Sequence, residues 1–370
     1  MHRITFHYSI GAAVRIIRFV MERSIYRIID ANFNRAREAI RVIEEFCRFA
    51  LNSSPLTERA KQFRHELSGV IGKLDNSRLI SSRDTVGDVG VGARVAHQLV
   101  RGELQDSFTA GCKRLTEALR TLAETTQTIE PEVAETLEKL RYAAYTLEKD
   151  IVVFSDAFER FRRVQLYVVI TSVLPAEVLS LLCYCVAGGA DCVQLRAKNI
   201  EDDKLFALSE EFVRICKSAG VLSIINDRAD IAVASGADGV HLGQNDIPVE
   251  QAHRLELTPL IVGKSTHSVD QLKSACLEMP TYVGLGPVYS TPTKPTAAAV
   301  GLNYVRQGTQ ILADTGICHV AIGGIMRDNI EEVLMSGAKA IAVCSAVTKA
   351  AEPSAACREL KRKIADFSRE

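Results

Sequence analysis

Polar side chains that could bind an anion follow an apolar run in the second half of the chain. The stretch GLGPVYSTPTK, residues 284–294, passes from apolar residues into a loop with Thr291, Thr293 and Lys294. Hydroxyl groups, backbone N–H groups released by glycine, and an ammonium are the partners that a phosphate or diphosphate needs. The stretch therefore predicts an anion-binding loop, although by itself it also suits an ordinary polar connector after a buried strand.

Other apolar runs end in polar residues in the same way. Gln194, Arg196 and Lys198 occupy alternate positions, so their side chains share one face of a strand. The polar residues that end the next three runs are Asn226, Asp227, Arg228, Gln244, Asn245, Asp246, Ser265, Thr266 and His267. Two aspartates among several cations suit a Mg²⁺ ion that bridges carboxylate and diphosphate oxygens, whereas simple ion pairing with those cations is the alternative.

A second anion site is predicted after the last two apolar runs. The segment AIGGI contains Gly323 and Gly324, and VCSA contains Cys344 and Ser345. Glycine lets a ligand approach the backbone closely, and the first turn of a following helix offers free N–H groups. Two anion sites, one with a metal, indicate a reaction that joins a diphosphate substrate to a phosphorylated one.

These residues need a scaffold that brings many strand ends to one rim. Eight short apolar runs alternate with helical segments, and a final helix is predicted over about residues 352–367. The runs are residues 165–171, 192–198, 221–227, 239–246, 260–267, 282–289, 319–325 and 340–346. Parallel strands that are buried on both faces read as such runs, and eight βα units predict a (β/α)₈ TIM barrel with its chemistry at the carboxyl ends of the strands.

The first half of the chain has a helical period. Apolar residues such as Phe33, Ile40 and Phe46 recur at three- and four-residue steps, with charged residues between them. Further helices are predicted over about residues 56–74, 106–127 and 131–150, which gives a helical bundle. The charged pattern of residues 35–45 recurs at 114–124, and it suits either intrahelical ion pairs or a charged groove for an anion or partner.

The length of 370 residues predicts two domains. We place an all-helical domain at residues 24–155 and the barrel at residues 160–370. Residues 1–23 are expected to be a flexible extension or a mis-assigned start, with Met21 as an alternative first residue. A glycine-rich connector with mixed charges, residues 81–94, is a weaker candidate for a phosphate-binding loop.

Composition argues against several classes of partner. Lys plus Arg and Asp plus Glu both number 45, so net charge gives no support for nucleic acid or an anionic membrane surface. The ten cysteines form no CxxC pair. This pattern suits reduced, buried thiols in a cytoplasmic protein better than a disulfide framework or a zinc site.

The second half of the chain resembles the thiamine-phosphate synthase family. The resemblance rests on QLRAK, NDR, GVHLGQND, GKSTH, GLGPVYSTPTK, AIGGI and VCSA, in the family's order and spacing. It implies a transferase that joins 4-amino-2-methyl-5-(diphosphooxymethyl)pyrimidine to 4-methyl-5-(2-phosphooxyethyl)thiazole, giving thiamine phosphate and diphosphate, with one Mg²⁺ per active site. The helical half is similar to the N-terminal extension of some members through YRIIDANFNRAREAIRVIEEFCRF, which implies no settled activity.

The same resemblance implies roles for individual residues. The pyrimidine diphosphate would be bound by Gln194, Arg196, Lys198, Asn226, Ser265 and Lys294. Of these, the groups that stabilise the departing diphosphate would be Arg196, Lys198, Ser265 and Lys294. Asp227 and Asp246 would hold Mg²⁺. The thiazole phosphate would be bound by Thr291, Thr293, Gly323 or Gly324, Cys344 and Ser345. Asn245 replaces an acidic residue of the family pattern, and Pro295 is a second departure.

The implied mechanism is dissociative: the C–O bond breaks before the thiazole nitrogen attacks, so positioning and electrostatics supply most of the rate. A thiazole tautomerase would use the same phosphate rim, with His267 as its acid/base residue. A tautomerase does not need the residues that are predicted to bind Mg²⁺ and diphosphate, so their presence favours the synthase. The helical half is expected to be a binding, regulatory or oligomerisation module. A second activity there, such as phosphorylation that supplies the diphosphate substrate, is disfavoured because the half lacks a GxxxxGK[ST] loop. The expected partners are two small phosphorylated substrates, and a homo-oligomer stays open.

Overall fold

The computed structural model describes residues 10–90, 92, 100–255, 259–291 and 298–367. Contacts divide the chain into two compact units, residues 1–151 and 152–370. Within the described ranges, no helix has the length and apolar content that a membrane span requires.

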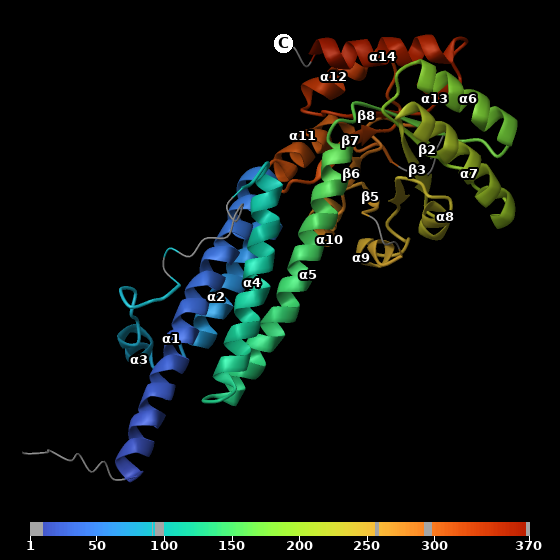
Figure 1. Cartoon of the computed structure of the whole chain (residues 1–370). Coiled ribbons are helices and arrows are strands. Elements are labelled where there is room, and N and C mark those ends of the chain that lie inside the picture. The colour runs from blue at the N-terminus through green and yellow to red at the C-terminus, as the bar shows by residue number, and fades with distance from the viewer. Residues whose placement is uncertain (1–9, 91, 93–99, 256–258, 292–297, 368–370) are drawn as a thin grey trace, which may run out of the picture. The chain divides into compact units, whose positions relative to one another are not determined.

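The second unit is a closed barrel of eight parallel strands in sequence order, as predicted (Figure 1). Its strands are β1 (Leu166–Ile170), β2 (Cys192–Leu195), β3 (Leu222–Asn226), β4 (Gly239–Leu242), β5 (Ile261–Thr266), β6 (Tyr282–Leu285), β7 (Cys318–Ile322) and β8 (Ile341–Val343). Its helices are α6 (Pro175–Ala187), α7 (Asp202–Ala219), α8 (Ala229–Ala234), α9 (Val249–His253), α10 (Val269–Glu278), α11 (Gly301–Leu312), α12 (Ile330–Met335), α13 (Ser345–Thr348) and α14 (Pro353–Phe367). Pairing of β1 with β8 closes the sheet.

Aromatic side chains fill the barrel at the amino ends of the strands. Phe161 is 1% exposed, and its ring stacks on Tyr282 with centroids 4.0 Å apart. A Cβ atom at Gly263 would lie 2.1 Å from Cζ of Tyr282, so glycine in β5 makes room for this ring. Burial of one such aromatic side chain contributes about 2–3 kcal/mol. This layer closes the barrel below the polar rim.

Phe161 belongs to helix α5 (Pro131–Phe161), which is longer than the sequence predicts. The predicted helix ends at residue 150 and the predicted domain boundary lies near residue 155, but α5 continues across both. The reason is packing, since Ala157 and Phe161 are buried with the barrel residue Tyr167 in one hydrophobic cluster. The last turns of α5 therefore belong to the barrel's core.

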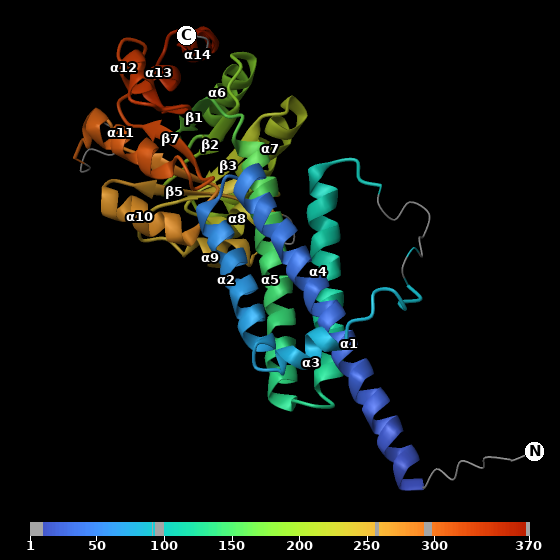
Figure 2. The ribbon, with the colours of Figure 1, turned by 90° about the vertical axis from the view of Figure 1, so that its left-hand side faces the viewer.

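The first unit is a helical bundle. Its elements are α1 (Ile10–Glu45), a π-helical turn η1 (Phe46–Ala50), α2 (Ser54–Ile71), α3 (Asn76–Ser81), α4 (Leu104–Thr126) and the first part of α5 (Figure 2). Ser53 caps α2 by accepting a hydrogen bond from the Leu56 N–H group, and Asp75 caps α3. Residues 10–23 are the first turns of α1, whereas the sequence predicts a flexible extension or a mis-assigned start there. The predicted start at residues 1–9 lies outside the described residues.

The repeated charge pattern of this unit forms intrahelical ion pairs. Arg41 pairs with Glu45 in α1 at 2.5 Å, and Arg120 pairs with Glu124 in α4 at 2.6 Å. The alanines of the two copies, Ala39 and Ala118, are buried. The first of the two interpretations, ion pairs on solvated faces, thus accounts for these contacts.

Candidate active site

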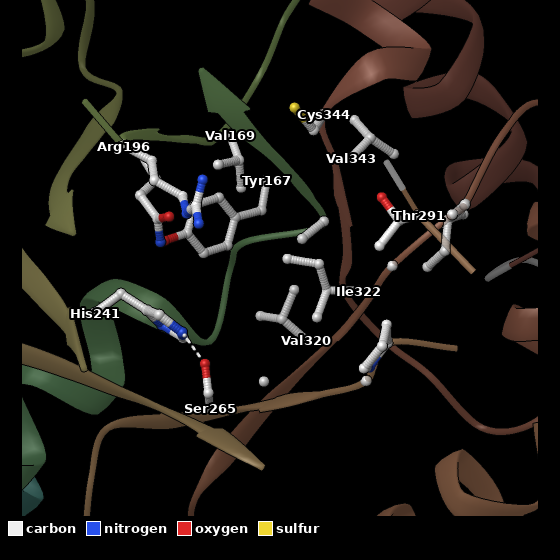
Figure 3. Close-up of a pocket in the computed structure, with 18 of the residues that line it drawn as sticks. Tyr167, Val169, Arg196, His241, Ser265, Thr291, Val320, Ile322, Val343 and Cys344 are labelled. Atoms are coloured by element: carbon white, nitrogen blue, oxygen red, sulfur yellow. Dashed lines mark hydrogen bonds between the residues drawn. The ribbon is translucent and has the colours of Figure 1, made fainter. Parts of the chain in front are cut away.

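One pocket at the carboxyl ends of the strands brings together most of the residues that the sequence predicts (Figure 3). Its lining includes the predicted residues Gln194, Arg196, Asn226, Ser265, Thr291, Gly323, Gly324, Cys344 and Ser345. His267, the acid/base candidate of the alternative reading, lines it too. Thr293 and Lys294 lie outside the described residues. Lys198, Asp227 and Asp246 do not line this pocket, but Asp227, the neighbour of Asn226 in sequence, interacts with both Lys198 and Asp246.

Alternation along the strands aims side chains into the pocket. Gln194 in β2 is paired with Val169 of β1 and Ile224 of β3, and its side chain is 4% exposed. Arg196 lies two residues further, where its backbone N–H donates to the Ile170 carbonyl at 2.9 Å. Inward-facing residues of a barrel occur at every second position, so these two side chains share the interior. Ser265 reaches the same space from β5.

Positive φ angles and tight packing mark the glycine pair after β7. Gly323 has φ +107° and Gly324 has φ +63°, a region that disfavours residues with a Cβ atom. A Cβ atom at Gly323 would lie 2.4 Å from Cα of Pro287. The Tyr289 N–H group donates to the Gly323 carbonyl at 3.0 Å. The pair thus packs directly against the segment that leads to Thr291.

Two carboxylates lie together beside a lysine. Burial and the neighbouring Asp246 carboxylate raise the pKa of Asp227, and Lys198 Nζ lies 3.3 Å from Asp227 Oδ2. Asp227 has φ +64°, and its N–H donates to the His241 carbonyl at 2.8 Å. Asp246 Oδ2 accepts from the Gly243 N–H at 2.6 Å. A divalent cation would relieve the repulsion between the two carboxylates, so this donor set fits Mg²⁺.

The number of protein ligands in such a site would be small. Among the described residues, no group of three or more His, Cys, Asp and Glu side chains could hold a metal. Mg²⁺ commonly takes one or two carboxylates and completes its shell with water and substrate phosphate oxygens. The carboxylate pair therefore suits a metal that is shared with a diphosphate.

Three further pocket residues, Tyr167, His241 and Tyr282, are absent from the predicted set. The Tyr282 hydroxyl lies 2.9 Å from that of Tyr167 and 3.0 Å from His241 Nδ1. His241 Nε2 lies 2.8 Å from Ser265 Oγ (Figure 3). The signal that could have found them is alternation, because each occupies an inward-facing position of its strand.

Comparisons with known proteins agree with this arrangement. The family model described as thiamine monophosphate synthase matches residues 166–347, and that of the ThiD2 family matches residues 27–150. A thiamine-phosphate synthase of Nostoc sp. is 36% identical over 337 residues, covering 90% of this chain and 92% of the relative. That of Thermosynechococcus vestitus is 37% identical over 342 residues, covering 91% and 94%.

A solved structure extends the likeness to the barrel. Thiamine phosphate pyrophosphorylase from Pyrococcus furiosus is 32% identical, with a TM-score of 0.51, and the match covers 55% of this chain and 96% of that one. The curated relatives match along nearly their whole length, through helical half and barrel alike. This chain therefore belongs to the thiamine-phosphate synthase family of transferases.

Proposed function

We propose that this protein joins 4-amino-2-methyl-5-(diphosphooxymethyl)pyrimidine to 4-methyl-5-(2-phosphooxyethyl)thiazole, giving thiamine phosphate and diphosphate. The observation that carries the proposal is the pocket at the strand ends, which is lined by residues from both predicted substrate sets. A tautomerase would need only the phosphate rim and a proton-transfer residue. The family relationship points the same way.

The pyrimidine diphosphate occupies the side of the pocket formed by β2, β3 and β5. The amides of Gln194 and Asn226 face the aminopyrimidine, since amide groups both donate and accept hydrogen bonds. Arg196, Ser265 and Lys198 bind the diphosphate oxygens, together with Lys294 of the predicted loop. These cations and the hydroxyl stabilise the charge that grows on diphosphate as it leaves.

Asp227 and Asp246 would hold one Mg²⁺ ion. When bound, it neutralises charge on the departing diphosphate. Lys198, which pairs with Asp227 at 3.3 Å, lies beside this charge. The two carboxylates and the lysine thus set the position of the diphosphate.

The thiazole phosphate occupies the opposite side of the pocket. Its oxygens contact Thr291 and Thr293, the backbone at Gly323 or Gly324, and the first turn of α13 at Cys344 and Ser345. This tether holds the thiazole nitrogen near the pyrimidine methylene carbon as the C–O bond breaks. A dissociative reaction of this kind needs no nucleophilic side chain, and orientation supplies much of the rate.

The two halves of the polypeptide have different roles. Residues 160–370 perform the chemistry, and residues 24–155, which the ThiD2 family model overlaps, serve an accessory or regulatory role. Oligomerisation of the full chain through this half is one form that the role could take.

Two variants test the assignment of the substrates. Arg196→Ala should raise KM for the pyrimidine diphosphate at least about tenfold, because a hydrogen bond to a charged group contributes about 1.5–3 kcal/mol. Thr291→Ala should instead raise KM for the thiazole phosphate. The readout is thiamine phosphate formation with each substrate varied in turn. Equal effects of both variants on both substrates would contradict the assignment, and thiazole isomerisation without condensation would favour the tautomerase.

A further inference from the structure

A chain of hydrogen bonds crosses the barrel interior from Gln194 to Ser265. Gln194 Nε2 donates to the Tyr167 hydroxyl oxygen at 2.8 Å. The hydroxyls of Tyr167 and Tyr282 lie 2.9 Å apart. The Tyr282 hydroxyl lies 3.0 Å from His241 Nδ1, and His241 Nε2 lies 2.8 Å from Ser265 Oγ. The chain thus links two strands whose ends bind different parts of one substrate in the proposed function.

The amide of Gln194 fixes the direction of the first bonds. Because Nε2 donates to the Tyr167 oxygen, Tyr167 can donate its own hydrogen to the Tyr282 hydroxyl, which lies 2.9 Å away. Burial raises the pKa of both phenols well above the usual range, so each keeps its hydrogen. The hydrogen of Tyr282 is then donated to His241 Nδ1.

The imidazole passes this direction to the serine. With Nδ1 as acceptor, the neutral ring carries its hydrogen on Nε2 and donates it to Ser265 Oγ. A protonated imidazole would donate at both nitrogens, so Tyr282 could no longer donate to Nδ1 and this direction would be lost. Ser265 therefore accepts from His241 and keeps its own hydrogen for a group in the pocket that it lines.

Reversal of the Gln194 amide would reverse every bond. If Oε1 faced Tyr167, hydrogens would run from Ser265 through His241 and Tyr282 to the amide oxygen. Ser265 would then donate its hydrogen to His241 Nε2 and could not donate it to a ligand in the pocket. The orientation of one amide thus decides whether Ser265 can donate to an anion.

We propose that this chain couples recognition of the substrate's amine at Gln194 to binding of its diphosphate at Ser265. An amine that donates to Gln194 Oε1 holds Nε2 toward Tyr167, which leaves the Ser265 hydrogen for a diphosphate oxygen. The inference rests on the proposed function, in which Gln194 meets the aminopyrimidine. Tyr167, Tyr282 and His241 are then positioning residues.

The surroundings of the hydrogen-bond chain favour one stable direction of donation. Tyr167 is 2% exposed and Tyr282 is fully buried, so bulk water does not compete for their hydrogens. Phe161 stacks on Tyr282 with centroids 4.0 Å apart, and Gly263 leaves the space that its ring needs.

A double-mutant cycle in the full chain tests the coupling through thiamine phosphate formation. Tyr282→Phe removes the central hydroxyl and should lower kcat/KM for the pyrimidine diphosphate at least about tenfold, with KM for the thiazole phosphate unchanged. In a Ser265→Ala background, Tyr282→Phe should lower kcat/KM for the pyrimidine diphosphate less than about twofold. The Ser265 hydroxyl, whose hydrogen the hydrogen-bond chain orients, is already absent there. An equal loss in both backgrounds would show a packing role and overturn the proposal.

Tyr304→Phe is the matched control. Tyr304 is also buried, and its hydroxyl donates to Thr266 Oγ1 at 2.7 Å, beside Ser265 but outside the chain. This variant should change kcat/KM less than about twofold in both backgrounds. An effect as large as that of Tyr282→Phe would mean that any lost buried hydroxyl disturbs the site, which would overturn the proposal. Unfolding temperatures of all variants identify a loss that comes from misfolding.

A binding measurement separates this inference from the proposed function. Calorimetry gives the Kd of inorganic diphosphate with Mg²⁺, with and without saturating 4-amino-2,5-dimethylpyrimidine. The pyrimidine should tighten diphosphate binding about fivefold in the native protein, the lower range of such couplings, and less than twofold in Tyr282→Phe. Equal coupling in the two proteins would overturn the proposal that the hydrogen-bond chain carries it. Coupling without thiamine phosphate formation would overturn only the proposed reaction.

Discussion

Asp227 combines an unusual backbone conformation with a carboxylate that lies close to a second carboxylate, Asp246. Its φ of +64° lies in the left-handed region, where Asp and Asn are tolerated better than residues with larger or branched side chains. Burial and Asp246 raise its pKa, and Lys198 lies at 3.3 Å. A position that keeps a strained backbone and a disfavoured charge suits a functional site better than a purely structural one.

Asp227→Asn tests the metal assignment at this residue. Asn keeps the left-handed backbone but removes the charge, so the Mg²⁺ concentration for half-maximal activity should rise at least about tenfold, the lower end of the loss expected even for an outer-shell partner. The unfolding temperature should stay close to that of the native protein. Activity measured across a Mg²⁺ titration gives the answer.

Asp230→Asn is the control for this prediction. Asp230 lies three positions along the chain and pairs with Arg228 at 2.7 Å on the exposed side. Its loss should leave the Mg²⁺ requirement unchanged. If Asp227→Asn and Asp230→Asn behave alike, the two carboxylates near Lys198 are ordinary ion-pair partners.

The sequence reveals some site residues and conceals others for a physical reason. Gln194 and Arg196 are polar residues at alternate positions of an apolar run, and such a pattern is visible locally. Tyr167 and Tyr282 look like core residues in their own strands, and His241 is flanked by apolar neighbours. Only the closed barrel brings Tyr167 and Tyr282, 115 positions apart, within hydrogen-bond distance.

At the scale of elements, the end of α5 shows how tertiary packing extends a helix. The predicted boundary lies near residue 155, because helical amphipathicity gives way there to short apolar runs. The structure continues the helix because Phe161 stacks on Tyr282 inside the barrel. Burial against another element outweighs the weak local preference.

Packing of α1 on α2 depends on one buried carboxylate. Glu44 is fully buried, with Arg64 Nε at 2.9 Å and Arg41 Nη1 at 3.1 Å. Glu44→Ala would leave these arginines without that partner and a cavity behind it. The free energy of unfolding should fall by about 1.5–3 kcal/mol, because hydrogen bonds to a buried charged group are lost. Urea unfolding followed by circular dichroism measures it.

The neighbouring Glu45 supplies the control. It pairs with Arg41 at 2.5 Å but is one-third exposed. Glu45→Ala should lower the free energy of unfolding by less than about 1 kcal/mol, as is usual for a solvated pair. Similar losses at Glu44 and Glu45 would show that burial of the first carboxylate has no special weight.

Strand β7 carries a histidine that should make stability depend on pH. Burial, then the charge of Lys339, lower the pKa of His319 from 6.5 to about 4. The Lys339 N–H donates to His319 Nε2 at 3.1 Å, which requires the unprotonated nitrogen. The unfolded chain therefore binds a proton between pH 6.5 and about 4 that the native protein does not, and stability falls as pH falls through this window.

His319→Gln should remove this dependence. Glutamine keeps a side-chain acceptor but does not titrate. Linkage of about 1.4 kcal/mol per pH unit predicts that the native protein loses up to about 2 kcal/mol more than the variant between pH 6.5 and 5. Parallel urea unfolding at pH 7 and pH 5 gives the difference, and identical losses in the two proteins would refute the assignment to His319.

At the scale of the whole molecule, the barrel could be predicted because each strand has a recognisable pattern in the sequence. Parallel strands covered by helices read as unbroken apolar runs, so eight of them in series predict closure. The extent of α1 was not predictable in this way. Arg15 and Arg18 interrupt the apolar bias of the first residues, although residues 10–23 are helical in the structure.

The reaction itself is tested most directly by ³¹P NMR of one sample that contains the full chain, both phosphorylated substrates and Mg²⁺. The account predicts that the signals of the pyrimidine diphosphate and thiazole phosphate fall together. Those of thiamine phosphate and inorganic diphosphate should rise in equal amounts, and chelation of Mg²⁺ should stop the change. Unchanged pyrimidine diphosphate in the presence of folded protein and Mg²⁺ would contradict the account.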